Sequence, residues 1–530
     1  MLCIYVYYIY LNSFSLIIEF TRLSIEMRKR LLGENHPDVA QSLNNLAAFY
    51  VIQGNYSEAE DYFFQALDLW KIHLGEEHEE IATILNNIAE VYREQGRYAE
   101  SEKMHIKALN MRKSLFGEKH DDVAQSLDNL AGIYENQARY QDAEKMHLQA
   151  LAMRKKLLGE EHWNVAASLN NLAALYDSQG RFTEAEDYYT QAFELCKKCL
   201  GNDEHPYIAI ILNNLGGISK NLGRYADAER IHLKALEIRK AIFGKEHLDV
   251  AQSLNNLGNV YLLQGLYLKA EDVYQQAYDI RKLFLNTEHP DIVKLLHNFA
   301  VLYTYQGRYQ TAESICLKTL SAIEKAYGKN HPNYADNLNH LGLVYQKQGN
   351  YSQAEQKYLT SLAIRKNIFG EEHHDIVKSL NRIAEIYRLQ GRYSQAEAIY
   401  KENYQLAKNL LGEMHPDVAG ILNSLAVLYD AQFKYAEAEK LFTEVFLIIR
   451  SQFGNNHPQV ATTLNNLATV YGSLECFSEA EELHLQVLEI RKSIFGEEHP
   501  DITNSYNNLA EIYLAQGKYA EAEKYYNLAL

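Results

Sequence analysis

The segment VAASLNNLAALYDSQGRFTEAEDYYTQAFEL (residues 165–195) carries two apolar stripes joined by a turn. The first stripe consists of Val165, Leu169, Leu172, Ala173 and Tyr176. The second stripe consists of Ala185, Tyr188, Tyr189, Ala192 and Leu195. Both have the spacing of one face of an α-helix, and the QGRF sequence between them supplies a glycine for a tight turn. The segment therefore predicts two helices packed as a hairpin.

A Gly-x-x-His-like marker repeats along the whole chain. Its histidines are His36, His78, His120, His162, His205, His247, His289, His331, His373, His415, His457 and His499. Ten of the eleven intervals are 42 residues, and the interval from His162 to His205 is 43. All seven prolines directly follow a marker: Pro37, Pro206, Pro290, Pro332, Pro416, Pro458 and Pro500. We number the units by these histidines, from unit 1 (His36) to unit 12 (His499). A fixed period predicts a solenoid of stacked units instead of several globular domains.

The repeated pattern resembles the tetratricopeptide repeat, whose usual unit has 34 residues. The 42-residue form, with LNNLA at residues 43–47, 169–173 and 464–468, is most similar to the repeats of kinesin light chains and their bacterial relatives. This resemblance implies an all-α, right-handed superhelical solenoid of about twelve helix-turn-helix units with a concave groove. Kinesin light chains also carry a heptad coiled coil ahead of their repeats. This sequence has none, so a motor-adaptor role is not expected.

The repeat pattern divides the chain into an N-terminal segment and an array. We expect residues 1–13 to be a degenerate apolar segment and residues 14–530 to form the solenoid, with a half-repeat at 14–33 and a truncated last unit. Residues 1–18 contain no charge. Their length is marginal for a membrane span, and they lack the basic start and cleavage site of a signal peptide. A decayed first helix is the favoured interpretation, and a membrane anchor is the alternative.

Composition excludes several classes of function. The 530 residues are 47% apolar and 23% charged, which is ordinary for a folded protein. The net charge of −17 argues against nucleic acid as a partner, because phosphates require a basic surface, and against docking on anionic lipid. Five cysteines without a paired framework indicate a reducing compartment, so a cytoplasmic location is expected.

No group of residues in the sequence predicts catalysis, a metal site or a cofactor. The marker histidines lie one unit apart and do not converge as zinc ligands must, which favours a structural role at the start of a helix. Cys196 and Cys199 form a lone CxxC at the end of a predicted helix, where the dipole does not stabilise a thiolate, and Cys199 is assigned an apolar position. The Glu-Ala-Glu carboxylates are two residues apart on a helix and face different ways. We therefore expect a non-enzymatic protein.

The first helix of each unit carries a predicted ligand-binding stripe. Asparagine follows the first leucine-like position in ten of twelve units: Asn44, Asn86, Asn170, Asn213, Asn255, Asn339, Asn381, Asn423, Asn465 and Asn507. We call this position the asparagine slot; its exceptions are Asp128 and His297. In the tetratricopeptide family such positions line the groove, and an amide can bind both the N–H and the C=O of a peptide. The alternative is that the amides bond neighbouring helices within the solenoid. For the second asparagine of each pair (Asn45, Asn171, Asn466), the structural role is favoured.

Charge along this stripe is uneven. At the asparagine slot and the positions three before and four, seven and eight after it, units 1–4 have a net charge of −4 and units 10–12 a net charge of −2. Units 5–9 have a net charge of +3, with Asp336 and Glu385 opposed by five cations: Lys220, Lys294, Lys347, Lys378 and Arg388. This pattern predicts an acidic peptide bound at the central units. The alternative is that these cations extend into solvent and pair with nearby glutamates.

The sequence thus predicts a protein-interaction scaffold that binds an extended peptide or a partner domain in its groove. The competing hypothesis is a sensor arm of a larger signalling or nucleotide-switch protein, whose effector domain lies outside this chain. Stability is expected to be uneven, because the turn glycine is replaced at Ala138, Phe433 and Glu475. The segment 433–477 is therefore predicted to be less protected from hydrogen exchange than the units around Asn170 and Asn255.

Overall fold

The computed structural model describes residues 14–201 and 204–530, and every element in these ranges is a helix. Each unit contributes a first helix, the A helix, and a second, the B helix. The A helices are α3 (Pro37–Ile52), α5 (Glu79–Glu94), α7 (Asp121–Asn136), α9 (Trp163–Ser178), α11 (Pro206–Asn221), α13 (Leu248–Leu263), α15 (Pro290–Tyr305), α17 (Pro332–Lys347), α19 (His374–Leu389), α21 (Pro416–Ala431), α23 (Pro458–Ser473) and α25 (Pro500–Ala515). The prediction of an all-α solenoid is confirmed.

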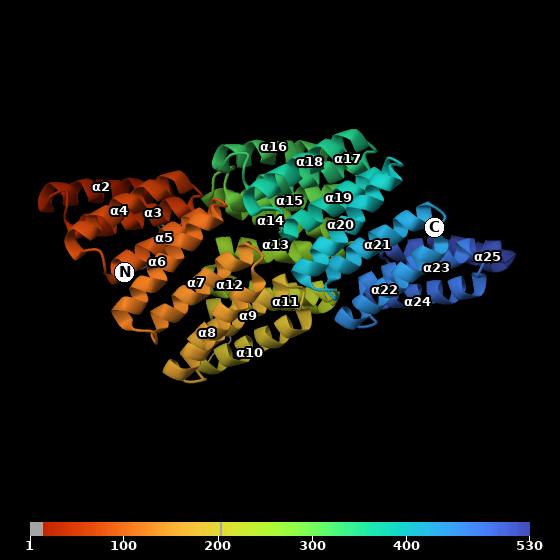
Figure 1. The fold of residues 1–530 in the computed structure, drawn as a ribbon, viewed down its shortest axis with the longest axis horizontal. Helices are drawn as coiled ribbons and strands as arrows, with labels where there is room; N and C mark the ends of the chain where they lie inside the picture. Colours follow the sequence, from red (N-terminus) through yellow and green to blue (C-terminus); the bar gives the residue numbers. More distant parts are fainter. Residues whose placement is uncertain (1–13, 202–203) are drawn as a thin grey trace.

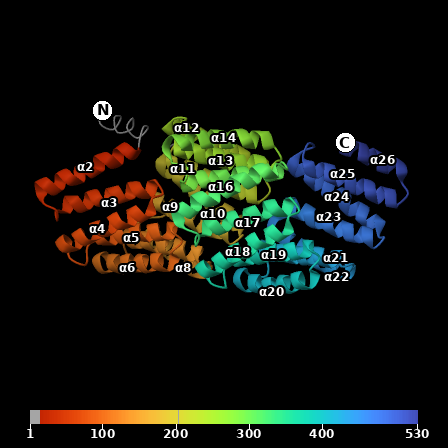
Figure 2. The same ribbon diagram turned by 90° about the horizontal axis from the view of Figure 1, so that it is seen from above.

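The B helices other than α26 are longer than the A helices, and one of them, α2 (Phe14–Leu32), precedes unit 1. The others are α4 (Tyr56–Leu74), α6 (Tyr98–Phe116), α8 (Tyr140–Leu158), α10 (Phe182–Leu200), α12 (Tyr225–Phe243), α14 (Tyr267–Phe284), α16 (Tyr309–Tyr327), α18 (Tyr351–Phe369), α20 (Tyr393–Leu411), α22 (Tyr435–Phe453), α24 (Phe477–Phe495) and α26 (Tyr519–Ala529). Figures 1 and 2 show α2 and α25 at opposite ends of the long axis.

Each marker histidine caps an A helix, which confirms its predicted structural role. The Nδ1 atom of His120, for example, accepts a hydrogen bond from the backbone N–H of Asp122, and the equivalent contact recurs in all twelve units. This contact satisfies one of the N–H groups that a helix start leaves unpaired. Where proline follows the histidine, it occupies the first helical position, where no N–H is needed.

Buried arginines join each B helix to the next A helix. Arg239 is 6% exposed and donates to the carbonyl of Asp249 (2.8 Å) and to the hydroxyl of Ser253 (2.9 Å). Equivalent arginines in other units donate to the equivalent serines: Arg112, Arg154, Arg365 and Arg491. These arginines therefore hold consecutive units together.

The solenoid curves with its A helices on the inside. Successive A helices approach one another more closely than successive B helices do. Because the inner side of a curved stack is the shorter one, this difference places the A helices on the concave face and the B helices on the convex face. The asparagine slot lies on these inner helices.

Consecutive turns of the superhelix touch, and six units make one turn. The Nε2 atom of His289 lies 3.0 Å from the carbonyl of Ile52, at the end of the A helix of unit 1. The same contact pairs units 8, 9 and 11 with units 2, 3 and 5: His331 with Glu94 (2.9 Å), His373 with Asn136 (3.1 Å) and His457 with Asn221 (3.1 Å). We call the line of contacts between units 1–6 and units 7–12 the seam. Nothing in the repeat pattern of the sequence predicts the seam.

Glycine and proline meet across the seam. The turn glycines of the first turn have φ near +70°, a conformation that side chains rarely adopt. A Cβ atom added to Gly54 would also lie 2.8 Å from the ring of Pro290, and one added to Gly223 would lie 2.6 Å from that of Pro458. These glycines therefore meet two requirements, backbone conformation and close approach.

Aromatic rings reinforce the seam. The first residue of a B helix in the first turn contacts the last residue of a B helix one turn later. The four ring pairs are Tyr56–Tyr327 (5.7 Å), Tyr98–Phe369 (5.7 Å), Phe182–Phe453 (5.5 Å) and Tyr225–Phe495 (5.7 Å). Such pairs contribute about 0.5–1.5 kcal/mol each beyond the area they bury.

The replaced turn glycines give a first prediction. Phe433 has φ +61° and a side chain that is 78% exposed, so little packing beyond an edge-to-face contact with the ring of Tyr435 (6.2 Å) compensates for its left-handed conformation. We expect Phe433→Gly to raise the free energy of unfolding by about 1 kcal/mol, because the left-handed conformation costs a side chain about that much. Urea unfolding and hydrogen exchange over residues 433–477 measure the effect.

The reverse substitution is the control. Gly391 has φ +74° and nothing within 4 Å of an added Cβ, so Gly391→Ala introduces the same strain without a clash. It should lower stability by about 1 kcal/mol. Equal hydrogen exchange in wild type and Phe433→Gly would show that the turn does not limit the stability of this segment.

Candidate functional site

A cavity of about 580 Å³ lies on the inner face of units 7–9. Its lining residues are His297, Asp336, Asn339, His340, Leu343, Arg365, Lys378, Asn381 and Arg382. Three of these, at positions 297, 339 and 381, are the slot residues of consecutive A helices, and Lys378 is one of the predicted cations. The structure therefore brings the predicted stripe of three units together in one concave site.

The oxygen atoms of the slot asparagines are largely used inside the solenoid. In six units the amide oxygen accepts a hydrogen bond from the second asparagine of the next unit. These pairs are Asn87–Asn44 (3.2 Å), Asn214–Asn170 (3.0 Å), Asn256–Asn213 (3.4 Å), Asn298–Asn255 (2.7 Å), Asn466–Asn423 (3.1 Å) and Asn508–Asn465 (2.7 Å). These six oxygens therefore bond neighbouring helices within the solenoid, which was the alternative to ligand binding. Asn466 has the structural role that the sequence favoured for it.

The NH₂ groups of most of these asparagines remain available. Among the described residues, Nδ2 makes no hydrogen bond in Asn44, Asn170, Asn255, Asn423 and Asn465, whereas that of Asn213 donates to Ser253 (3.1 Å). None of the five available groups is fully buried. The slot can therefore offer a ladder of donors to a ligand, although not the donor-and-acceptor ladder that the sequence suggested.

The remaining slot asparagines differ from this pattern. The oxygen of Asn86 lies 2.9 Å from Nδ1 of His105. Asn339, in the amide orientation that suits both neighbours, donates to Ser361 and accepts from Arg365. The oxygen of Asn381 is buried without a partner. Asn507, on α25, is half-buried.

The five predicted cations occupy different environments. Lys294 and Lys347 are exposed on α15 and α17 and form no ion pair among the described residues. Lys378 lies 4.0 Å from Asp375, and Arg388 pairs with Glu385 at 2.7 Å. Burial lowers the pKa of Lys220, and the nearby Asp177 opposes that effect. The alternative, in which the predicted cations pair with nearby acidic residues, therefore holds for Arg388. It does not hold for Lys294 and Lys347.

The cavity of units 7–9 also contains polar atoms without partners. Nε2 of His340 is buried and has no hydrogen-bond partner, as is the oxygen of Asn381. The rings of His297 and His340 lie 4.7 Å apart. Burial, assisted by His297, lowers the pKa of His340 to about 3, so this ring is neutral at physiological pH. Each of these atoms therefore lacks the hydrogen-bond partner that buried polar groups normally have.

A second set of histidines, on the B helices, contacts the slot and was missed by the sequence analysis. His147 lies 2.7 Å from Asp128 and 3.1 Å from Glu135, and Asp128 also binds Arg154 at 2.5 Å. His232 instead faces the neutral Asn213 (3.0 Å). Burial by itself would lower the pKa of His147, but the carboxylates of Asp128 and Glu135 outweigh this effect and raise the pKa to about 9. Burial lowers the pKa of His232 to about 4. The Asp128 exception thus converts a neutral pair into a buried ionic network.

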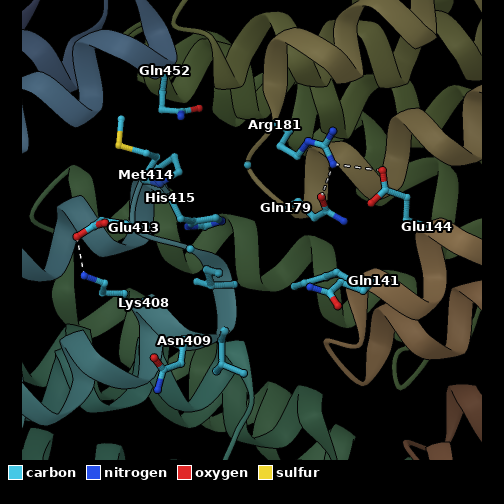
Figure 3. Close-up of a pocket in the computed structure, with 16 residues that line it drawn as sticks. Gln141, Glu144, Gln179, Arg181, Lys408, Asn409, Glu413, Met414, His415 and Gln452 are labelled. Atoms are coloured by element: carbon cyan, nitrogen blue, oxygen red, sulfur yellow. Dashed lines mark hydrogen bonds and ion pairs between the residues drawn. The ribbon is translucent and has the colours of Figure 1, made fainter.

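A further cavity, of about 600 Å³, interrupts the seam between units 3–4 and units 9–10 (Figure 3). At this place Leu411 replaces the aromatic residue that would stack on Tyr140, and both residues line the cavity. Nε2 of His415 has no hydrogen-bond partner, unlike Nε2 of His289, His331, His373 and His457. Figure 3 shows Arg181 bound to Glu144 and Gln179 across from His415. The cavity therefore marks a weak point in the seam.

The cysteines among the described residues carry no reactive thiol pair. Cys196 and Cys199 are both free, and Cys196 is buried whereas Cys199 is exposed. The assignment of Cys199 to an apolar position was therefore wrong, because the helix turns Cys196 inward instead. Burial raises the pKa of Cys196 to about 11, which disfavours the thiolate.

The N-terminal prediction falls largely outside the described residues. Residues 1–13 of the apolar segment 1–18 are not described. Within residues 14–201 and 204–530, no helix combines the length and the apolar character that a membrane span requires.

Comparison with protein families assigns the repeats. A tetratricopeptide repeat model matches residues 80–156, 129–198, 207–282, 291–367, 375–451, 417–493 and 459–530, and a second one matches residues 39–80. The chain belongs to the tetratricopeptide repeat family. This confirms the family that the sequence suggested, and tetratricopeptide repeat proteins generally mediate protein–protein interaction.

Several solved structures are similar to this tetratricopeptide repeat chain. BtubC (BKLC) from P. vanneervenii is 24% identical, with a TM-score of 0.37 over 44% of this chain and 93% of that chain. Two structures of putative kinesin light chain TPR-like repeats from Podosopora anserina are 23% identical, with TM-scores of 0.34 and 0.33. Both alignments cover 39% of this chain. They cover 97% of the chain in the first of these structures and 98% in the second. No curated protein sequence matches the chain.

The seam cavity of this tetratricopeptide repeat solenoid gives a second prediction. We expect Leu411→Phe to raise the free energy of unfolding by about 1 kcal/mol, because the new ring can stack on Tyr140 as Phe369 stacks on Tyr98. The matched control is Leu158→Phe, the same position of unit 3, where no earlier turn lies across a seam. Urea unfolding of both variants isolates the contribution across the seam. Equal stabilisation by the two substitutions would show that the cavity is not filled.

The buried network gives a third prediction. Asp128→Asn should lower the pKa of His147 from about 9 toward its ordinary value near 6.5, as followed by NMR titration of the ring. In the wild type His147 binds its proton more tightly when folded, so its contribution to stability is complete below pH 6.5 and is lost as the pH rises through 9. The variant should lack this loss, which is on the order of 3 kcal/mol at most.

A reciprocal variant tests the cause of the shift. Asn213→Asp places a carboxylate beside His232 and should raise the pKa of that ring above its value of about 4. If neither histidine changes its titration, the slot residue does not control the pKa of the facing ring.

Proposed function

We propose that this protein is an interaction scaffold that binds an extended acidic peptide on the inner face of its A helices, centred on units 7–9. The observation that carries the proposal is the concave cavity in these units, which collects the slot residues of three consecutive helices. Membership of the tetratricopeptide repeat family supports the general role in protein interaction.

The charge of the cavity favours an acidic ligand. Three of its lining residues are cations, Arg365, Lys378 and Arg382, and only Asp336 is an anion. Asp336 is already bound to Arg365, which leaves Lys378 and Arg382 to act on a ligand. Lys294 and Lys347 lie on the same helices, α15 and α17, and add positive charge. Inside a concave surface such fields are focused and reach a ligand more strongly than on a flat one.

The slot supplies contacts that do not depend on ligand sequence. An asparagine NH₂ group can donate to a peptide carbonyl. The groups that remain available belong to Asn44, Asn170, Asn255, Asn423 and Asn465, which lie on either side of units 7–9 along the inner face. Main-chain contacts would hold the peptide, and the cations would select acidic side chains.

Charge reversal tests the proposal and gives a fourth prediction. We expect Lys294→Glu combined with Lys347→Glu to weaken binding of acidic peptides about tenfold, which corresponds to about 1.4 kcal/mol. A peptide array identifies acidic ligands of the wild type, and fluorescence anisotropy compares their affinity for both proteins.

The control carries the same change of charge on the convex face. Lys318 and Lys440 are exposed on the B helices α16 and α22, and neither forms an ion pair among the described residues. Lys318→Glu combined with Lys440→Glu should leave peptide binding almost unchanged. Equal weakening by both double variants, or binding of basic peptides only, would contradict the assignment of the site.

A further inference from the structure

The seam is one interface repeated along the chain, and each turn leaves one half of it uncovered. In units 7–12 the marker histidines pack against the preceding turn, and the side chains of His373 and His499 are only 8% and 10% exposed. In units 1–6 they face no preceding turn among the described residues. The side chains of His36, His120 and His247 are there 37%, 44% and 35% exposed. The first turn therefore presents an open edge of histidine caps.

The second turn presents the complementary edge. A Cβ atom added to Gly349 or Gly517 meets nothing within 4 Å, whereas the equivalent atoms at Gly96 and Gly265 meet the next turn at 2.9 and 3.0 Å. Among the aromatic residues at the starts of the B helices from α4 onward, the two buried ones lie in the first turn, the two exposed ones lie in the second turn, and the others are half-buried. Tyr56 and Tyr225 in the first turn are each 7% exposed, whereas Tyr393 and Tyr519 in the second turn are 37% and 70% exposed.

We propose that a second copy of this chain docks head to tail, with the histidine edge of its first turn on the turn edge of units 8–12. The occupant follows from continuity with the seam, because each edge is complementary to the other and makes these contacts within one chain. The two surfaces are different, so the contact is heterologous and can be repeated by further copies. The proposal does not depend on the peptide site.

The residues at the seam favour the register between the two copies in which both prolines of the open edge face a glycine. Within the chain every seam proline faces a glycine, and Ala138 faces the unit in which His374 replaces proline. On the open edge only Pro37 and Pro206 follow a marker histidine. On the complementary edge Phe433 and Glu475 replace glycine, so neither can accept a proline closely.

Docking unit 1 of one copy on unit 8 of the next satisfies all of these constraints. The facing pairs, written with the docking copy first, are Pro37 with Gly349, Glu79 with Gly391, Asp121 with Phe433, Trp163 with Glu475 and Pro206 with Gly517. Docking unit 1 on unit 7 instead would press Pro206 against Glu475. Trp163, which is 52% exposed in the isolated chain, becomes covered in the favoured register.

Analytical ultracentrifugation of the 530-residue chain tests the proposal. We expect dimers and larger species whose proportion grows as the concentration rises toward about 100 µM, where weak interfaces associate. Gly349→Ala should weaken association roughly tenfold or more, because the added methyl group meets Pro37 of the docking copy as an added Cβ on Gly96 would meet Pro332. Circular dichroism checks that each variant stays folded.

Gly307→Ala is the matched control. Gly307 has φ +73° and Gly349 has φ +78°, both are open in the isolated chain, and only Gly349 faces a proline in the proposed register. Gly307→Ala should therefore associate like the wild type. A monomer at every concentration, a dimer that does not grow further, or equal weakening by both variants would each overturn the proposal.

Discussion

Four marker histidines of the second turn, His289, His331, His373 and His457, use both ring nitrogens, and the superhelix depends on this double use. Nδ1 accepts the backbone N–H that starts the A helix, as in the contact of His457 with Gln459 at 3.2 Å. A nitrogen that accepts carries no proton, so the proton of the neutral ring lies on Nε2. Nε2 then donates to the carbonyl of Asn221 one turn earlier (3.1 Å). The hydrogen bond that caps the helix thus fixes the proton on Nε2, which is the donor across the seam. Burial keeps the ring of His457 neutral by lowering its pKa to about 4.

The fold could be predicted from the sequence because every unit repeats the same local signals. The apolar stripes, the turn glycine and the histidine cap each act within one unit or between neighbours, so one unit such as residues 165–195 contains them all. The seam could not be predicted in this way. It depends on the small rotation between consecutive units, which accumulates over six of them and leaves no mark in the period of 42 residues. The proline at the seam, which seemed to serve only the helix start, also packs on a distant glycine.

The candidate site was predicted in position but only partly in chemistry. The slot lies on the inner helices because its spacing from the buried leucines fixes its face, and the cavity of units 7–9 contains it. The use of each amide could not be predicted, because it depends on the neighbouring unit. The NH₂ group of Asn298, for instance, donates to the oxygen of Asn255, which lies 43 positions earlier in the preceding unit. The facing histidines were missed for the same reason, since His147 reaches Asp128 only after the hairpin closes.

Pairing each unit with the one six places away also constrains how such a chain can change in length during evolution. Because every unit carries the same cap and a similar turn, duplication of a complete unit gives each histidine a new partner of the same kind. Insertion of one residue inside a helix has the opposite effect, since it rotates all later side chains by about 100° and separates the cap from its stripe. The one extra residue in the array lies between Gly201 and His205, in the connection from a B helix to an A helix, where it rotates no helix. Arrays of this design can therefore gain or lose whole units, and they accept single residues only in the connections between them.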